Sequence, residues 1–329
     1  MLNGLLKLNP KLFDADVKMV ATRKGYGEGL LEAGKENHQV VALCCDLTES
    51  TQTHLFAEAF PERFVEMGIQ EQSMASVASG MASMGKIPFI SSYAMFSPGR
   101  NWEQIRTTIC YNNANVKIVG AHAGISVGPD GGTHQALEDI AITRVIPNMM
   151  VFSPADAIEA KKTVVAMSRV KGPAYIRLGR TDTPVITTDD TPFEVGKAYI
   201  YFQSQNKEIK VGIIVTGPLL YNALTAARNL DSRGIGVKVL NLPTIKPFPD
   251  KDILAFRQWL LGIVTLEEHQ VAGGMGSSVS EFLSEKSPIR MSFMGIHDMF
   301  GQSGKPEELI EHYGMGISSI EKVVQTLLN

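Results

Sequence analysis

The chain has 329 residues, of which 44% are apolar and 20% charged, and its formal net charge is -3. This length suffices for two domains with a core each, and the charge gives no basic surface for nucleic acid. No apolar run is long enough to span a bilayer, and we expect no secretion signal at residues 1–10. The cysteines, Cys44, Cys45 and Cys110, suit a cytoplasmic protein better than a disulfide framework. We therefore expect neither a nucleic-acid nor a membrane partner.

Short apolar segments alternate with longer helical patterns along the first half of the chain. Strands are predicted at residues 40–45, 64–67, 87–92, 116–120, 149–152 and 174–178, and helices at residues 24–33, from 71 onward and at 100–112. Because the strands are continuously apolar, the pattern predicts an α/β fold in which helices cover both faces of a parallel sheet. Functional side chains in such sheets follow the carboxyl ends of strands.

A change in composition separates this unit from the rest of the chain. Residues 181–192 are rich in Thr, Asp and Pro and are predicted to be a linker, which gives domains at residues 1–190 and 191–329. In the second, smaller α/β domain we expect strands at 211–217, 237–242 and 261–266 and a helix at 219–233. The segment from Gly273 to Ser278 precedes another helix. Its N–H groups could hold an anion, although such glycines more often allow a strand and a helix to pack closely.

One acidic residue opens a long uncharged stretch. Gly68 is predicted to turn the chain and deliver Glu71 into a buried helix, since no charged residue follows before Lys86. A buried carboxylate is costly to ionise without a partner, so Glu71 is a candidate catalytic acid or hydrogen-bond donor. The alternative is a first-turn glutamate that complements the helix dipole. The stretch by itself favours that alternative.

Further candidates follow other predicted strands, namely Asp46, Phe96, His122 and Arg180. His122 and His134 bound a glycine-rich loop, a type of segment that lets backbone approach a ligand closely. Two surface histidines on a flexible loop are the alternative. The histidine and cysteine spacings match no zinc motif, and no P-loop sequence occurs. We predict no metal ligands on this chain.

Four segments carry a resemblance to a known family. They are residues 46–50 (DLTES), 67–74 (MGIQEQSM), 93–96 (YAMF) and 122–135 (HAGISVGPDGGTHQ). In this order and spacing they resemble the pyrimidine-binding half of transketolase, a thiamine diphosphate enzyme, and the resemblance covers nearly the whole chain. It implies a thiamine diphosphate-binding fold, with a parallel-sheet pyrimidine-binding domain followed by a smaller transketolase-type C-terminal domain.

The resemblance also implies how the chain would hold the cofactor. Glu71 matches the glutamate that hydrogen-bonds N1′ of the aminopyrimidine and stabilises its imino tautomer, so that the cofactor's N4′ takes the proton from C2 of the thiazolium. Phe96 and Tyr93 match aromatic residues that stack on the pyrimidine. Asp46 and Leu47 fall where the family lines the cofactor pocket, and a simple strand-end turn is their alternative.

A second group of residues matches the substrate side of the family. Ser50, His122 and two arginines match residues that grip a sugar phosphate, and forked guanidinium donors suit a phosphate or sulfonate. The arginines are Arg23 and Arg180. Asp130 matches the residue that reads the C2 hydroxyl of the acceptor aldehyde. His134 matches the residue at the donor's carbonyl and C1 hydroxyl, where a proton must move as the C2–C3 bond breaks.

Departures from the family pattern concern substrates and the metal. Gln72 stands where full-length transketolases have a histidine, and Gly99 and Gly132 also differ, which leaves the donor and acceptor open. The Gly-Asp-Gly motif that binds the metal and diphosphate has no counterpart. The resemblance thus implies the C-terminal subunit of a split transketolase. A separate N-terminal subunit would supply most of the Mg²⁺ or Ca²⁺ site, in an α2β2 assembly.

Two other functions remain open. One is the beta subunit of a 2-oxo acid dehydrogenase, or a deoxyxylulose-phosphate synthase-like enzyme. The anion-binding set argues against the dehydrogenase, which binds a small oxo acid. The other is a regulatory or binding subunit without catalysis, against which Glu71 and His134 argue.

Overall fold

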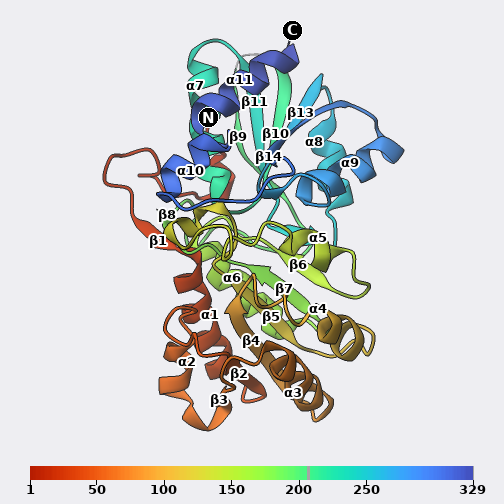
Figure 1. Ribbon diagram of the computed structural model, residues 1–329. Helices are drawn as coiled ribbons and strands as arrows, with labels where there is room; N and C mark the ends of the chain where they lie inside the picture. Colours follow the sequence, from red (N-terminus) through yellow and green to blue (C-terminus); the bar gives the residue numbers. More distant parts are fainter. Residues whose placement is uncertain (206–207, 329) are drawn as a thin grey trace.

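The computed structural model describes residues 1–205 and 208–328, which form two α/β domains stacked end to end (Figure 1). Both chain termini lie in the second domain in this view. The N-terminus is held there because the Met1 carbonyl accepts a hydrogen bond from the Gln203 amide at 3.0 Å. Among the described residues no helix is long and apolar enough to cross a membrane.

A seven-stranded sheet in the order β12-β6-β7-β5-β4-β2-β3 organises the first domain. Its strands are β2 (Val40–Cys44), β3 (Phe64–Glu66), β4 (Ile87–Tyr93), β5 (Lys117–Ala121), β6 (Met150–Phe152), β7 (Ala174–Arg177) and β12 (Thr244–Lys246). All neighbours are parallel except β12, which pairs antiparallel with β6. The predicted parallel sheet is confirmed, and each predicted strand end lies within one residue of the observed one.

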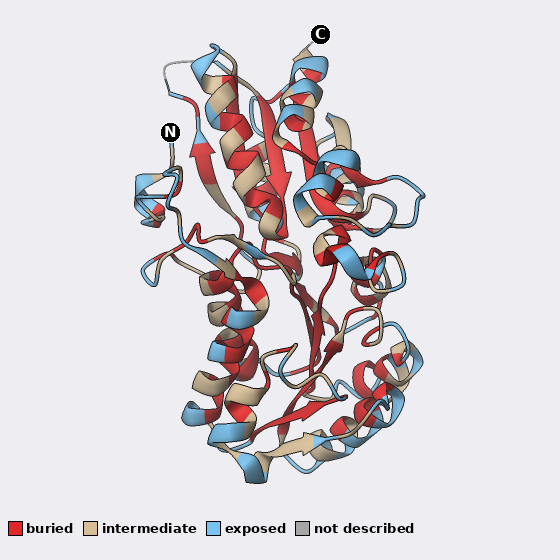
Figure 2. Cartoon of the chain, turned by 60° about the vertical axis from the view of Figure 1, so that its left-hand side comes forward, coloured by how far each residue is buried: buried red, intermediate tan, exposed pale blue. Residues whose placement is uncertain are grey.

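Helices cover both faces of this sheet, and its strands are buried between them (Figure 2). One face carries α1 (Thr22–Glu36), α2 (His54–Ala59) and α6 (Ala157–Arg169); the other carries α3 (Glu71–Ser83), a π-helical segment (Ile105–Cys110) and α5 (Asp139–Arg144). Alternate residues of β2 serve the two faces, since Val40 and Ala42 join the first cluster and Val41 and Leu43 the second.

Glycines set the closest helix contact of this domain. A Cβ on Gly25 of α1 would lie 1.9 Å from the carbonyl oxygen of Ala157, and one on Gly29 would lie 2.8 Å from that of Lys161. Helices α1 and α6 therefore pack backbone to backbone. This contact places the first turn of α1, with Arg23, at the carboxyl edge of the sheet.

The second domain is built on a five-stranded sheet in the order β14-β13-β10-β11-β9. Its strands are β9 (Tyr199–Gln203), β10 (Ile209–Val215), β11 (Gly236–Asn241), β13 (Gly262–Gln270) and β14 (Arg290–Ile296), of which β9 alone among these is antiparallel. Helices α7 (Leu220–Ser232) and α11 (Ile317–Leu328) cover one face and α8 (Asp250–Arg257) and α9 (Met275–Lys286) the other. The side chains of α8 and α9 share one apolar cluster with α3 and α5, so the two domains have a continuous core.

The prediction that residues 181–192 form a linker without regular structure is wrong. Asp182–Pro184 forms β8, which pairs antiparallel with β1 (Met19–Ala21). Beyond it, the amides of Ile186 and Thr187 donate to Oδ2 of the buried Asp156 at 2.7 and 2.5 Å. Composition missed this because Thr187 donates hydrogen bonds to buried Asp156 and Pro184 lies in the short paired strand β8. Strand β12 also crosses the boundary predicted at residue 190, since it joins the first sheet.

Two helix predictions need correction. Only one face of α3 is buried, through Glu71, Met74, Ala75 and Ala78, whereas its neighbours Gln72, Ser73, Ser76 and Val77 are exposed. The sequence prediction rested on the lack of charged residues between Glu71 and Lys86, and this lack is the same on the buried and the exposed face of the helix. The helix predicted at 100–112 is a short α4 (Trp102–Gln104) that continues as the π-helical segment. The remaining short helical elements are α10 (Pro306–His312) and 3-10 turns at Gly4–Leu6, Pro61–Arg63, Ile125–Asp130 and Gly217–Leu219.

Candidate active site

The predicted site residues gather at one edge of the first sheet. Asp46 follows β2, Glu71 follows β3, Phe96 follows β4, His122 follows β5 and Arg180 follows β7. These strands are neighbours in the order β7-β5-β4-β2-β3 and run in the same direction. Their carboxyl ends therefore bring residues that are far apart in sequence to the same edge, as parallel-sheet topology requires.

Glu71 is the first residue of α3 and is 3% exposed. Gly68, at φ +67°, makes the turn that leads into this helix. The Ser92 hydroxyl donates to Oε1 of Glu71 at 3.2 Å, and Nη1 of Arg100 lies 3.4 Å from Oε2. Two further lone-pair positions of the carboxylate remain for a ligand.

Aromatic rings form a continuous surface beside this carboxylate. The rings of Tyr93 and Phe96 stack with centroids 5.9 Å apart, and His122 stacks on Tyr93 at 3.9 Å. His134 meets Phe96 edge-on at 5.6 Å. The Arg100 guanidinium lies 4.5 Å from the centroid of Phe96, so it connects the rings to Glu71. A planar ligand could stack here while hydrogen-bonding the carboxylate.

His122 is a buried, neutral imidazole. Burial, followed by the charges of Arg23, Arg180 and His134, lowers its pKa to about 3. Its Nδ1 is buried without a hydrogen-bond partner among the described residues. The backbone of His122 is left-handed, at φ +53°, a conformation that few non-glycine residues adopt. The unpaired nitrogen is a polar contact that a ligand can complete.

Two arginines converge beside this imidazole. Nη1 of Arg23 donates to the Ser50 carbonyl at 2.7 Å, and Nε donates to the Arg180 carbonyl at 3.2 Å. Nη1 of Arg180 donates to the Val127 carbonyl at 3.0 Å. Burial and the neighbouring Arg180 both lower the pKa of Arg23. Two adjacent cations that bind neutral carbonyls make a site for an anion.

Four predicted site residues differ from the expected form. Ser50 meets Arg23 through its carbonyl rather than its hydroxyl. Asp130 is exposed at the end of the 3-10 turn. Asp46 and Leu47 act locally, since the Asp46 amide donates to Oε1 of Glu66 at 2.7 Å and the Leu47 carbonyl accepts from the Thr51 amide at 2.8 Å. The structure therefore joins Glu71, Phe96, Tyr93, His122 and His134 through Arg100 and ring contacts. It joins Arg23 to Arg180 and Ser50 by hydrogen bonds, and Asp130, Asp46 and Leu47 lie outside these contacts.

Sequence reasoning missed the partners of Glu71. Ser92 lies near the end of β4, so the same strand-end argument that selected Phe96 could have found it. Arg100 and Asn101, whose side-chain amide donates to the Glu71 carbonyl at 3.1 Å, lie in a loop with no local signal. Glu66 was also missed, although its carboxylate binds Asp46, Thr48 and Gly68 and so fixes two loops of the edge.

The glycine segment at residues 273–278 packs against the carboxyl group of Glu267, which lies in the same domain. The amides of Met275 and Gly276 donate to the carboxylate of Glu267 at 2.6 and 2.8 Å. A Cβ on Gly274 would lie 2.2 Å from that carboxylate. The close-packing interpretation of these glycines therefore fits the structure.

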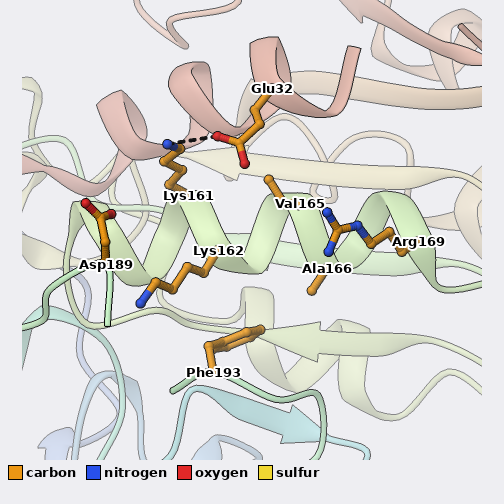
Figure 3. A pocket seen from close by; sticks show the side chains of 8 residues that line it. All are labelled: Glu32, Lys161, Lys162, Val165, Ala166, Arg169, Asp189 and Phe193. Atoms are coloured by element: carbon orange, nitrogen blue, oxygen red, sulfur yellow. Dashed lines mark ion pairs between the residues drawn. The ribbon is translucent and has the colours of Figure 1, made fainter. Parts of the chain in front are cut away.

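A hollow beside α6, lined also by Glu32 of α1 and by Asp189 and Phe193, contains none of the predicted site residues (Figure 3). Lys161 lies 2.8 Å from Glu32, Arg169 lies 2.8 Å from Glu36, and Lys162 donates to the Thr188 carbonyl at 2.7 Å, so these cations already have partners. Among residues 1–205 and 208–328, no group of three or more His, Cys, Asp or Glu side chains is arranged to hold a metal ion.

Comparison with known proteins identifies the family of this α/β chain. The description "transketolase, pyrimidine binding domain" matches residues 18–185, and "transketolase, C-terminal domain" matches residues 201–320. The chain belongs to the transketolase family. It is 43% identical to a putative transketolase C-terminal section of Methanocaldococcus jannaschii, over 91% of this chain and 94% of that protein.

Further relatives show which part of the family the chain represents. It is 35% identical to human transketolase over 94% of its own length but only 49% of the human protein, so it spans about half of the full-length enzyme. A 6-deoxy-6-sulfo-D-fructose transketolase subunit of a Clostridium species is 35% identical over 91% of both chains. A split-gene transketolase, solved as an inactive beta4 tetramer, matches with a TM-score of 0.86 at 42% identity over 94% of this chain and 98% of that one.

Membership of this family implies thiamine diphosphate as the cofactor. The residues present fit its pyrimidine ring, because a buried carboxylate with free lone pairs lies beside stacked aromatic rings. Glu71 and the rings of Phe96 and Tyr93 are the groups that would hold it.

Proposed function

We propose that this chain is the C-terminal subunit of a thiamine diphosphate-dependent transketolase, which moves a two-carbon ketol unit from a ketose to an aldose. The observation that carries the proposal is the continuous set of contacts from Glu71 through Arg100 and Phe96 to Tyr93 and His122. This set supports a surface on which a ring can stack, and the charges of Arg23 and Arg180 act on His122 at its end. A transferase acting on an anionic sugar needs both.

Each residue then has a defined task. Glu71 hydrogen-bonds N1′ of the pyrimidine, and Ser92 holds the carboxylate in position. Phe96 and Tyr93 orient the ring by stacking. When bound, thiamine diphosphate supplies the carbanion chemistry. His134 is the candidate group for moving a proton at the donor's carbonyl and C1 hydroxyl, and Asp130 for contacting the C2 hydroxyl of the acceptor.

The other end of the site recognises the substrate's charge. Arg23 and Arg180 bind the distal anion, with Ser50 beside them. His122 stays neutral, since its pKa is lowered to about 3, and so contributes a hydrogen bond rather than a third positive charge. Phosphate and sulfonate both suit this site. The sulfosugar transketolase subunit named above, 35% identical to this chain, favours testing both.

A separate N-terminal subunit is the proposed partner. The exposed face of α3 carries Gln72, Ser73, Ser76 and Val77 without a charge, and Ile69 and Met84 at its two ends are 68% and 82% exposed. A subunit that covers this face would also close the cofactor site beside Glu71. An α2β2 assembly, with Mg²⁺ or Ca²⁺ held mainly by the partner, follows as a prediction, as does a cytoplasmic location.

The test is purification of the partner with this chain, followed by a screen of ketose and aldose pairs with thiamine diphosphate and Mg²⁺. We expect ketol transfer by the complex, and weak cofactor binding by this chain alone in calorimetry. Oxidative decarboxylation of a 2-oxo acid by the complex would instead favour the dehydrogenase alternative. Tight metal-dependent binding by the isolated chain would contradict the partner's role.

A further inference from the structure

The glycine-rich loop of the site is held by a carboxylate from the second domain. Glu268 lies in β13 and is 4% exposed. Its Oε1 accepts a hydrogen bond from the Ser126 amide at 2.5 Å. A Cβ on Gly124, whose φ is +90°, would lie 2.3 Å from the same oxygen. Any side chain at position 124 would therefore displace Glu268, and the glycine lets the carboxylate reach the loop backbone.

The peptide that Glu268 holds is connected directly to the anion-binding arginines. The Ser126 carbonyl accepts a hydrogen bond from the Thr181 hydroxyl at 2.8 Å. The next carbonyl, that of Val127, accepts from Nη1 of Arg180 at 3.0 Å. The carbonyl of Arg180 in turn accepts from Nε of Arg23 at 3.2 Å. One short path thus runs from Glu268 to both guanidinium groups.

The same part of the second domain meets the loop at other points. Nη2 of Arg177, at the end of β7, donates to the Glu268 carbonyl at 2.6 Å and to the Ala136 carbonyl at 3.3 Å. Nε2 of Gln135 donates to the carbonyls of Ile125 and Gln302, both at 3.0 Å. Burial raises the pKa of Glu268, while Arg177 and the Ser126 amide act in the opposite direction. Glu268 is therefore a buried acid whose hydrogen bonds hold the loop in its position.

We propose that Glu268 is a positioning residue for substrate specificity: by binding the Ser126 amide it sets the Val127 carbonyl that orients Arg180 toward the substrate's anion. The inference rests on the proposed function, because that function gives Arg180 its ligand. It assigns the second domain a part in recognition, although no residue of that domain is in the predicted site. Glu268 acts through Arg180 and does not itself touch the substrate.

Two variants and a matched control separate this role from simple stability. Glu268→Ala removes the acceptor, whereas Glu268→Gln keeps an oxygen that can accept from the Ser126 amide. Glu267→Ala is the control, since Glu267 is a buried neighbour on the same strand whose partners, Met275 and Gly276, lie within the second domain. The control should reveal any effect of destabilising that domain alone.

The first measurement is hydrogen–deuterium exchange of the full chain, which does not depend on activity. We expect peptides covering residues 122–135 to exchange about tenfold faster in Glu268→Ala, but not in Glu267→Ala or Glu268→Gln. Unchanged exchange in Glu268→Ala would overturn the proposal. Equal acceleration in Glu267→Ala would also overturn it, because the effect would then be general.

The second measurement is steady-state kinetics of the complex with its partner, using ribose 5-phosphate or glycolaldehyde as the acceptor. For Glu268→Ala we expect KM for ribose 5-phosphate to rise about tenfold more than KM for glycolaldehyde, with Glu268→Gln within about threefold of wild type. Equal changes for both acceptors would overturn the proposal. If Arg180→Ala raises KM mainly for ribose 5-phosphate and Glu268→Ala does not, the anion site stands and only the role of Glu268 is wrong. If Arg180→Ala shows no selectivity, the proposed anion site fails, and the exchange experiment still decides whether Glu268 holds the loop.

Discussion

Nη1 of Arg100 lies 3.4 Å from Oε2 of Glu71, and the same guanidinium lies 4.5 Å from the centroid of the Phe96 ring. Glu71 is buried whereas the Arg100 side chain is 52% exposed, so the arginine reaches the carboxylate from the open side of the site. The contact with Arg100 can hold the buried carboxylate of Glu71 in position while no ligand is bound. The relationship makes Glu71 the first residue to test.

Glu71→Gln should separate a catalytic glutamate from a helix-capping one. The amide keeps the shape and can still accept from the Ser92 hydroxyl, so we expect a stability loss of roughly 1 kcal/mol or less. Turnover of the complex should fall by about 100-fold or more, since an amide cannot share a proton with the pyrimidine. Thermal unfolding and kcat are the measurements. Near-normal kcat in a folded variant would remove Glu71 from the mechanism.

Arg180→Ala should weaken the use of anionic sugars mainly through KM. Loss of a charged hydrogen bond of about 1.5–3 kcal/mol corresponds to roughly a 10- to 100-fold lower kcat/KM. Erythrulose with glycolaldehyde, which carry no anion, should be affected far less. Arg169→Ala is the matched control, because this arginine is 63% exposed and pairs with Glu36 away from the site. Equal losses with charged and neutral substrates would mean that Arg180 has a structural role.

His122→Asn should reduce the acid sensitivity of folding. The pKa of His122 is lowered from 6.5 to about 3, so its contribution to stability is fully present above pH 6.5 and is lost as the pH falls toward 3. The wild-type chain should lose about 1 kcal/mol from this residue by about pH 5.5. Asparagine tolerates the left-handed backbone at this position.

Urea unfolding of both proteins across this pH range measures the effect of His122. The difference in unfolding free energy between wild type and variant should change with pH in favour of the variant under acid conditions. A difference that stays constant would show that His122 ionises in the folded chain as it does in the unfolded one.

Gly25→Ala should destabilise the first domain. The new Cβ would lie 1.9 Å from the Ala157 carbonyl oxygen, so α1 and α6 must separate, at a cost of about 1–3 kcal/mol or more. Gly80→Ala is the control, because a Cβ there meets nothing within 4 Å on an exposed position of α3. That variant should gain about 0.5–1 kcal/mol. Denaturant midpoints of the two variants that shift in the same direction would contradict the packing argument.

The strands of the first sheet could be predicted because their signal is local. Continuous apolar runs such as Val40–Cys44 must be buried on both sides, so the parallel sheet and the strand-end position of Glu71 and His122 follow from the chain itself. Tyr93 and Arg23 needed the family resemblance, since each alone is an ordinary surface residue type. Local composition then misjudged residues 181–192, where polar side chains stabilise packed backbone.

The sequence by itself determined the fold class, the sheet edge that carries the site and the identity of most candidate residues. Only the tertiary structure decided what those residues touch. Arg100 reaches Glu71 across a loop, and Glu268 reaches Ser126 from 142 positions away along the chain. Such contacts depend on how the two domains pack through their shared core, and no short-range pattern records that packing. Glu267 and Glu268 are neighbouring carboxylates in one strand, and the sequence does not distinguish them. In the structure Glu267 binds the start of α9 in its own domain, whereas Glu268 binds a loop of the first domain.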